Sequence, residues 1–247
     1  MSGDNYFAAA IETLQRLKES QRENVAAAAE LLANAIASNR AIFSFGATHS
    51  FMVTEELVYR AGGLMLVNPI SATGMDLSVR PLTATSERER IVGLGKEILK
   101  ASPARSGDVL LLASTSGRNA VIIDMALAAR EDGIKVIGVT SFAYTSGVTS
   151  RHPSGKKLAD LCDVLLDNGA PLGDAVVKVD GVPQKVGPLS TIGSCAVVNA
   201  LVAETVAMLV QRGIEPPVFA SGNMDGGDVL NARLLAANRH RIFYMEP

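Results

Sequence analysis

The sequence is poor in aromatic side chains and has little excess charge of either sign. Tryptophan is absent and aromatic residues make up 4% of the 247 residues, which leaves little material for the stacking platforms of proteins that bind single-stranded nucleic acid. The formal net charge is −2, and no run of basic residues occurs. Electrostatics therefore favour neither nucleic acid nor an anionic membrane as a partner.

Cysteine is nearly absent as well. Cys162 and Cys195 are the two cysteines, and they stand far apart without a C-x-x-C pair, so neither a disulfide framework nor a zinc site is indicated. The Gly93-x-Gly95 pair lies inside an expected helix, whereas a dinucleotide fingerprint follows a strand. We therefore expect no metal and no cofactor, and the cytoplasm is the simplest compartment.

Long apolar runs are missing too. The first 20 residues mix charges into their apolar positions, and no segment has the roughly 20 consecutive apolar residues of a transmembrane helix or the core of a signal peptide. Hydrophobic residues nevertheless make up 48% of the chain, enough for the core of one large α/β domain. We expect a single domain with a helical segment at 1–40, a core at 41–211 and a C-terminal extension at 212–247.

The most informative stretch is Asp108–Arg130. Val109–Ala113 is a short unbroken apolar run, typical of a strand covered on both faces. Ala120–Arg130 has apolar residues at helical spacing, and the hydroxyl-rich turn Ser114–Asn119 lies between the two. Free N–H groups at a helix N-terminus attract anions, and small hydroxyls add donors. The turn therefore fits a phosphate site, although simple capping of the helix is an alternative.

A second stretch repeats this pattern. Ala41–Phe45 reads as a buried strand, the turn Gly46–Ser50 contains glycine and hydroxyl residues, and Phe51–Arg60 is helical. In a doubly wound sheet of order 2-1-3-4-5, the first and third strands are neighbours, and ligands bind in the crevice at their carboxyl ends. Both turns would then line one crevice, which favours a phosphorylated small molecule over two independent helix caps.

The remaining pattern alternates strands with helices, which predicts a parallel sheet with both faces covered. An Asp180-Gly181 pair between two valine-rich segments indicates a β-hairpin insertion. The further expected elements are helices at 6–38, with a break near Ser20, at 86–100 and at 195–210, strands at 64–67, 135–140 and 163–166, and a hairpin at 175–186.

Two of these helices carry more apolar surface than one sheet face needs. The N-terminal helical segment is apolar at three- and four-residue spacing over 6–38, and the helix at 195–210 is apolar almost all round. A second copy of the chain is the natural place to bury the excess. We therefore expect a homodimer or homotetramer.

The motifs FGATHS, TEELVYRAGG, LLASTSGRNA and IGVTS, in this order, resemble the SIS (sugar isomerase) domain, and more narrowly a branch of that family close to the phosphoheptose isomerases. The resemblance spans about residues 41–209. It implies a flavodoxin-like three-layer sandwich around a five-stranded parallel sheet, a sugar-phosphate ligand and an oligomer with active sites near the subunit interfaces.

The resemblance also assigns roles to individual residues. The phosphate-binding positions are the Gly46 turn with Ser50, and the second turn with Ser114, Thr115, Ser116 and Asn119. Glu56 falls where the isomerases keep their catalytic carboxylate, displaced by about one helical turn, or roughly 5 Å. Asn199 occupies the position of the isomerase histidine, and an amide cannot exchange a proton near neutral pH.

Three kinds of function remain open at this point. An aldose–ketose isomerase would use Glu56 as base and, as its acid–base partner, His49 beside the first turn, or else His152 or His240, which lie in polar stretches typical of a surface. A lyase resembling the SIS etherase would use Glu56 with a second acid, Glu87 or Glu89. A non-catalytic protein that senses a sugar phosphate is the third possibility.

Overall fold

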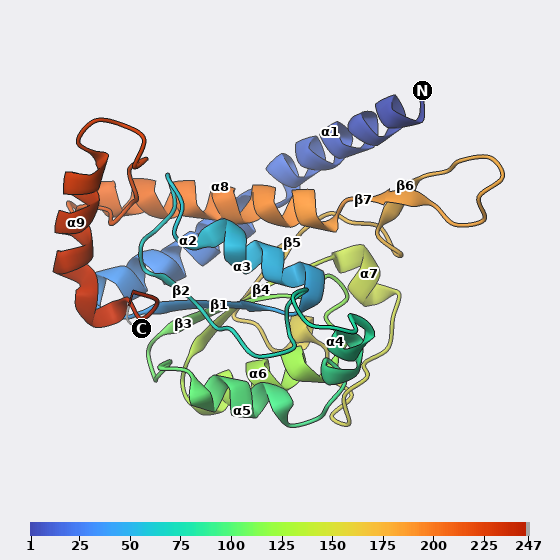
Figure 1. Ribbon diagram of the computed structural model, residues 1–247, viewed down its shortest axis with the longest axis horizontal. Coiled ribbons are helices and arrows are strands. Elements are labelled where there is room, and N and C mark those ends of the chain that lie inside the picture. Colours follow the sequence, from blue (N-terminus) through green and yellow to red (C-terminus); the bar gives the residue numbers. More distant parts are fainter. Residues whose placement is uncertain (246–247) are drawn as a thin grey trace.

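The protein is built around a five-stranded parallel sheet, in a computed structural model that describes residues 1–245 (Figure 1). The strand order β2-β1-β3-β4-β5 confirms the expected doubly wound topology. The strands are β1 Ile42–Gly46, β2 Val67–Pro69, β3 Val109–Ala113, β4 Lys135–Thr140 and β5 Val164–Asp167.

Helices cover both faces of the sheet and produce the expected flavodoxin-like three-layer sandwich. Successive strand residues alternate between two cores: Ile42 packs with α2, α3 and α8, whereas Phe43 packs with α5 and α6. The helices are α1 Ser2–Ser20, α2 Arg22–Ala37, α3 Phe51–Leu57, α4 Thr83–Arg88, α5 Leu94–Ala101, α6 Ala120–Glu131, α7 Phe142–Ser146, α8 Ser190–Gln211 and α9 Gly227–Asn238, with short 3₁₀ turns at Thr48–Ser50, Leu158–Asp160 and Arg239–Arg241.

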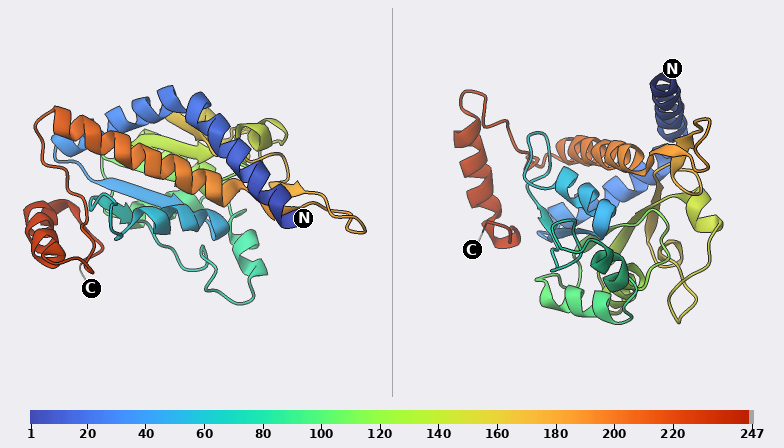
Figure 2. Two further views of the ribbon diagram at one scale, coloured as in Figure 1. Left: turned by 90° about the horizontal axis from the view of Figure 1, so that it is seen from above. Right: turned by 45° about the vertical axis from the view of Figure 1, so that its right-hand side comes forward.

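The N-terminal helical segment breaks at Gln21, close to the predicted position. The Gln21 side chain is buried and its Oε1 accepts a 2.9 Å hydrogen bond from the Asp167 amide at the end of β5. This contact anchors α2 against the sheet, while α1 extends past the body of the molecule (Figure 2). Much of α1 therefore carries side chains without an intramolecular partner.

The second strand lies further along the chain than the sequence predicts. Leu64 forms an isolated bridge with Val218, and the Met65 amide donates to the Pro217 carbonyl, 2.8 Å away. The C-terminal extension therefore hydrogen-bonds to the backbone at Leu64 and Met65, which a strand at 64–67 would have paired with the sheet. Pairing with β1 begins only at Val67.

The predicted helix at 86–100 is two helices, α4 and α5. Gly93 separates them with a left-handed φ of +90°, and its amide donates a 2.6 Å hydrogen bond to Asp124 Oδ2 on α6. A Cβ on Gly95 would lie 1.9 Å from the Val121 carbonyl oxygen, so this glycine is required for the close packing of α5 on α6. The sequence placed this pair inside one helix, whereas Gly93 precedes α5 and only Gly95 lies within it.

The β-hairpin insertion is present, but with a longer loop than expected. Its strands are β6 Ala175–Val177 and β7 Val186–Pro188, which pair antiparallel. The tight turn at Asp180-Gly181 forms, with a Val182-to-Val179 backbone hydrogen bond of 3.1 Å. It sits at the tip of the segment 178–185 instead of joining the two strands directly, and the hairpin projects beside α1 (Figure 1).

The long apolar helix α8 begins five residues earlier than predicted. By length and composition alone α8 could cross a membrane, yet Val198 and Leu201 on one face are fully buried in the core it shares with α2 and α3. Ile192 and Val210 on other faces are exposed. Only part of the helix surface is therefore covered within one chain.

Candidate functional site

The two hydroxyl-rich turns meet at the carboxyl ends of neighbouring strands. Gly46 at the end of β1 pairs in register with Ala113 at the end of β3, so the segments that follow them start side by side. Between them lies a cavity of about 310 Å³, near the lower end of the range for small-molecule sites. It is lined by Ala47, Thr48, His49, Ser50, Glu89, Ala113, Ser114, Thr115, Ser116, Asn119, Val121, Ile122, Tyr144, Gly173, Asp174 and Ser190.

The first turn is sharp because Gly46 lies directly beneath it. A Cβ at this position would lie 2.2 Å from the Ser50 carbonyl oxygen, which is too close for any side chain. Thr48 adopts a left-handed φ of +53°, and its amide donates a 2.6 Å hydrogen bond to the Met75 carbonyl. Gly46 therefore shapes the turn, while His49 and Ser50 line the cavity.

The second turn is held from outside by the segment 140–158. Four successive turn carbonyls accept hydrogen bonds from this segment: Thr115 from the Ser141 amide (3.0 Å) and Thr140 Oγ1 (3.1 Å), Ser116 from Thr145 Oγ1 (3.2 Å), Gly117 from the Leu158 amide (2.8 Å) and Arg118 from the Arg151 amide (2.9 Å). Gly117 has a left-handed φ of +60°, with Leu158, Thr140 and Thr145 close around it. The turn is thus fixed by its carbonyl groups.

This anchoring determines where the turn amides point. In a trans peptide the N–H of a residue is directed opposite to the preceding carbonyl, so the amides of Ser116, Arg118 and Asn119 face away from the segment 140–158. Within residues 1–245 these three amides donate to no protein acceptor. Asn119 is also the N-cap residue of α6. Free amides at a helix N-terminus form an anion cradle.

A polar chain crosses one wall of the cavity. Asn119 Nδ2 donates a 2.5 Å hydrogen bond to Glu89 Oε2, and Asn119 Oδ1 accepts one of 3.1 Å from Arg151 Nη1. The Glu89 carbonyl in turn accepts a 3.1 Å bond from the Val121 amide, which fastens the end of α4 to the start of α6. Glu89 is therefore a carboxylate of the cavity, in a fixed orientation.

Sequence reasoning missed Tyr144, Asp174 and Ser190 as lining residues. Asp174 caps α8: its Oδ1 accepts the amides of Leu189 (2.9 Å) and Ser190 (2.7 Å), and its Oδ2 accepts the Ser190 hydroxyl (2.6 Å). Asp174 itself has a left-handed φ of +69°. Asp174 lies 16 residues before Ser190, so no local capping pattern in the sequence reveals it. This cap explains why α8 starts before its predicted position.

Glu56 does not line this cavity in the single chain. It lies on α3 with its side chain 23% exposed, forms an ion pair with Arg60, and accepts a 2.6 Å hydrogen bond from Asn199 Nδ2 on α8. The two positions that the resemblance matched to the isomerase base and histidine are therefore in contact. Glu56 lies six residues along the chain from Ser50, which lines the cavity.

The three histidines have different surroundings. His49 lines the cavity, and His240 is exposed on the last 3₁₀ turn. The expectation that His152 is a surface residue is wrong: its side chain is 8% exposed, because its Nε2 bonds to Asp124 Oδ1 (3.0 Å) and its Nδ1 to Ser154 Oγ (2.7 Å). Its polar neighbours suggested a surface position, but the loop folds back onto α6.

The fold and the paired turns define a SIS-type protein, and comparison with known proteins agrees. The family model described as SIS domain matches residues 5–141. The chain belongs to the SIS domain family. Among its relatives are UPF0309 protein SCO4393 of Streptomyces coelicolor, 45% identical over 97% of this chain and 96% of the relative, and UPF0309 protein OB3413 of Oceanobacillus iheyensis, 42% identical over 97% and 98%. These likenesses place it among the UPF0309 proteins.

Two solved structures share the fold over most of the chain. The phosphoheptose isomerase GmhA of Neisseria gonorrhoeae matches with a TM-score of 0.56 and 20% identity, covering 83% of this chain and 96% of that one. A phosphoheptose isomerase of Francisella tularensis matches with a TM-score of 0.54 and 18% identity, covering 82% and 95%. At these identities the likeness establishes the common architecture.

Proposed function

We propose that the protein binds a phosphorylated sugar, with the phosphate held where the two turns converge. The observation that carries this proposal is the pair of free amides at Ser116 and Asn119, two residues that line the cavity together with Ser50 and Ser114. Amides and hydroxyls arranged around the N-terminus of α6 suit a phosphate dianion. A phosphoheptose isomerase is a structural neighbour, which supports a phosphosugar as the ligand.

We further propose aldose–ketose isomerisation as the reaction. Glu56 would remove the proton from carbon two of the open-chain sugar and return it to carbon one, and His49 would shuttle the proton between the two sugar oxygens. A sugar running from the cradle past Ser50 along α3 passes toward Glu56, six residues or about 9 Å further along the axis. Asn199 keeps the Glu56 carboxylate in place through its amide.

Elimination is the second candidate, and one observation favours it. Glu89 lines the cavity itself, whereas Glu56 lies beside it. A lyase needs one carboxylate to take a carbon-bound proton and an acid to protonate the departing oxygen. Glu89 could serve as one of this pair, with Glu56 as the other.

A ligand screen followed by a proton-exchange measurement tests these proposals. Thermal unfolding of the full chain with five- to seven-carbon sugar phosphates should reveal a stabilised complex, since a ligand at ~100 times its Kd adds about 2.7 kcal/mol. Ligands that bind are then followed by NMR in deuterated water. Exchange at carbon two supports the isomerase, an unsaturated product supports the lyase, binding without either supports a sensor, and no binding by any phosphosugar refutes the phosphate site.

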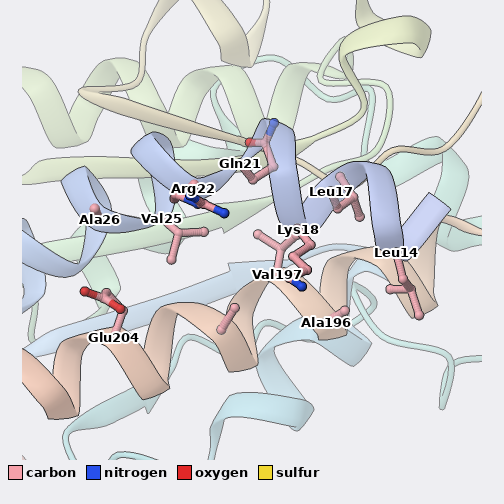
Figure 3. A pocket seen from close by; sticks show the side chains of 11 residues that line it. Leu14, Leu17, Lys18, Gln21, Arg22, Val25, Ala26, Ala196, Val197 and Glu204 are labelled. Carbon is pink, nitrogen blue, oxygen red and sulfur yellow. The ribbon is translucent and has the colours of Figure 1, made fainter. Parts of the chain in front are cut away.

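We also propose that the protein is a homodimer or larger homo-oligomer, in the cytoplasm, where its two free cysteines suit a reducing compartment. Phe7 and Ile11 on the projecting α1 are 67% and 56% exposed. An apolar groove of about 380 Å³ runs between α1, α2 and α8 (Figure 3) and is lined by Leu14, Leu17, Lys18, Gln21, Arg22, Val25, Ala26, Ala196, Val197, Ala200 and Glu204. A second copy would cover both surfaces.

A further inference from the structure

Four arginines surround the wall of the cavity that Asn119 forms. Arg88 and Arg90 flank Glu89 at the end of α4, Arg118 precedes Asn119 in the second turn, and Arg151 binds Asn119 directly. In the described part of the chain, residues 1–245, none of the four has a carboxylate partner within 4 Å. Among residues 1–245, the only hydrogen bond from any of their guanidinium groups is that of Arg151 to Asn119.

Two of these arginines each bury one donor atom without an acceptor. Among the described residues, the buried side-chain polar atoms that lack a hydrogen-bond partner are Nε of Arg88 and Nε of Arg118. Buried donors are almost always satisfied, and an unpaired one costs free energy. Both exceptions belong to arginines that are next in sequence to residues lining the cavity, Glu89 and Asn119, which indicates that this region is shaped for a group that supplies acceptors.

The arginines approach the cavity from two sides. The Arg88 side chain passes over Gly74, where a Cβ would meet its Cδ at 2.6 Å, and the adjacent Met75 carbonyl binds the amide of Thr48 in the first turn. Arg118 and Arg151 flank the second turn through their 2.9 Å backbone hydrogen bond. Arg88 therefore contacts the segment that holds the first turn, and Arg118 and Arg151 lie at the second turn.

These like charges also act on one another. Desolvation lowers the pKa of the Arg151 guanidinium, and the nearby Arg118 and Arg90 lower the same pKa further. Glu89, which lies between Arg88 and Arg90 in the sequence, lines the cavity, and its carboxylate already accepts a hydrogen bond from Asn119. Clustered guanidinium groups that repel each other are stabilised by a bound anion, and their planar forks suit phosphate and carboxylate oxygens.

We propose that Arg88, Arg90, Arg118 and Arg151 recognise a second anionic group of the ligand. The preferred ligand is then a phosphosugar that carries a further phosphate or a carboxylate, with its first phosphate in the cradle of the two turns. This inference rests on the proposed phosphosugar function, because it needs the first phosphate to place the sugar. Arg90 is exposed and is the member that can be changed with least effect on folding and on the phosphate cradle.

Titration calorimetry of the full chain with matched ligands tests this. The probes are fructose 6-phosphate, fructose 1,6-bisphosphate and 6-phosphogluconate, the last two differing in the second anion, at one fixed ionic strength. We expect at least one doubly anionic probe to bind about 10-fold tighter or more than the monophosphate, since hydrogen bonds to charged groups are the stronger kind. A preference for one probe over the other identifies phosphate or carboxylate as the second group.

The Arg90→Gln variant should reduce this ratio to about 2 or less and leave the monophosphate Kd within about threefold. Lys100→Gln is the matched control, because it removes the same charge at the opposite end of the sheet, before β3, and should keep the ratio. A wild-type ratio of one with measurable monophosphate binding overturns the inference and leaves the proposed function standing. Equal loss of all ligands in the arginine variant also overturns it.

A last arm separates a macromolecular partner from a small ligand. If the arginine variant loses affinity for a short DNA duplex while the ligand ratio in the wild type is one, the cluster serves a polyanion and the inference is wrong. Failure of every phosphosugar to bind refutes both the proposed function and this inference. That outcome is distinct from a ratio of one, which refutes the inference alone.

Discussion

The Asn199 amide donates a 2.6 Å hydrogen bond to Oε1 of Glu56, and the Arg60 guanidinium contacts Oε2 of the same carboxylate. The same Asn199 nitrogen also donates to the Cys195 carbonyl at 3.0 Å, which fixes the amide on α8. A carboxylate with a donor on each oxygen is well oriented as a base. The neutral amide, however, cannot take part in proton transfer.

Replacing Glu56 with glutamine should therefore separate binding from turnover. The change keeps the side-chain shape and removes the base, so we expect turnover of an isomerised phosphosugar to fall by about 10²- to 10⁴-fold. Its Kd should change little, because Glu56 lies outside the phosphate cradle. Steady-state rates and calorimetry measure the two quantities.

Two further variants serve as controls for this experiment. Glu55→Gln alters the exposed neighbour on the same helix and should leave the rate unchanged. Glu89→Gln should slow turnover strongly only if the cavity carboxylate does the chemistry. Full activity in Glu56→Gln together with a collapse in Glu89→Gln would transfer the role of base from α3 to α4.

The Ser114→Ala/Ser116→Ala variant should weaken phosphosugar binding by at least about 10-fold, because hydroxyl donors to a phosphate are lost. Ser114 Oγ also accepts the Gly117 amide at 3.2 Å, so a stability loss of about 1 kcal/mol accompanies the change. Ser146→Ala, at an exposed hydroxyl on α7, is the control. An unchanged Kd in the double variant would remove the phosphate from this turn.

Gly46→Ala should destabilise the fold and abolish ligand binding together. The new Cβ would lie 2.2 Å from a backbone oxygen of Ser50, which cannot rotate away, and overpacking of this kind costs about 1–3 kcal/mol. Gly3→Ala, where a Cβ meets nothing within 4 Å, is the matched control. Denaturant unfolding and calorimetry would show the two effects, and a variant that binds normally would contradict our view of the turn.

Light scattering should show an oligomer in the wild type, and Phe7→Asp/Ile11→Asp should shift it toward the monomer. Each aspartate would place a charge in an apolar interface, where burial of an unpaired charge is costly. Met224→Asp, at a side chain 69% exposed on the C-terminal extension, should leave the assembly intact. A wild-type monomer at micromolar concentration would be inconsistent with the proposal.

Cys162 should make stability depend on pH in the alkaline range. Burial raises the pKa of its thiol to about 12, whereas a cysteine in an unfolded chain ionises near pH 8.5. The unfolded state therefore loses a proton that the folded state keeps, so the stabilising contribution is complete below about pH 8.5 and declines as the pH rises toward 12. The difference in unfolding free energy between wild type and Cys162→Ala should shrink from pH 8 to 10.5, and parallel curves would refute the assignment.

The sequence was sufficient for the sheet order and for the convergence of the two turns. The apolar runs located β3 and β4 at their observed bounds, since β3 is apolar throughout and β4 is buried from Val136 to Thr140. The link from the Gly46 turn to the Ser114 turn followed from topology alone. Features defined by strand alternation and local turn chemistry were thus predictable.

Long-range contacts determine the features that could not be predicted from the sequence, namely two element boundaries and the burial of His152. β2 starts late because Leu64 pairs with a segment more than 150 residues away, and α8 starts early because Asp174 reaches it from the hairpin. The burial of His152 depends on Asp124, on another element. No local pattern carries such information, because each partner is chosen by the tertiary fold.

The anchored carbonyls of the second turn have a consequence for the thermodynamics of ligand capture. Because the segment 140–158 already fixes residues 115–118, the conformational entropy of aligning the amides is lost once, during folding, and an arriving phosphate meets donors that need no rearrangement. Affinity at this turn is then governed mainly by the exchange of water for phosphate oxygens. The backbone of the turn should be the same with and without ligand.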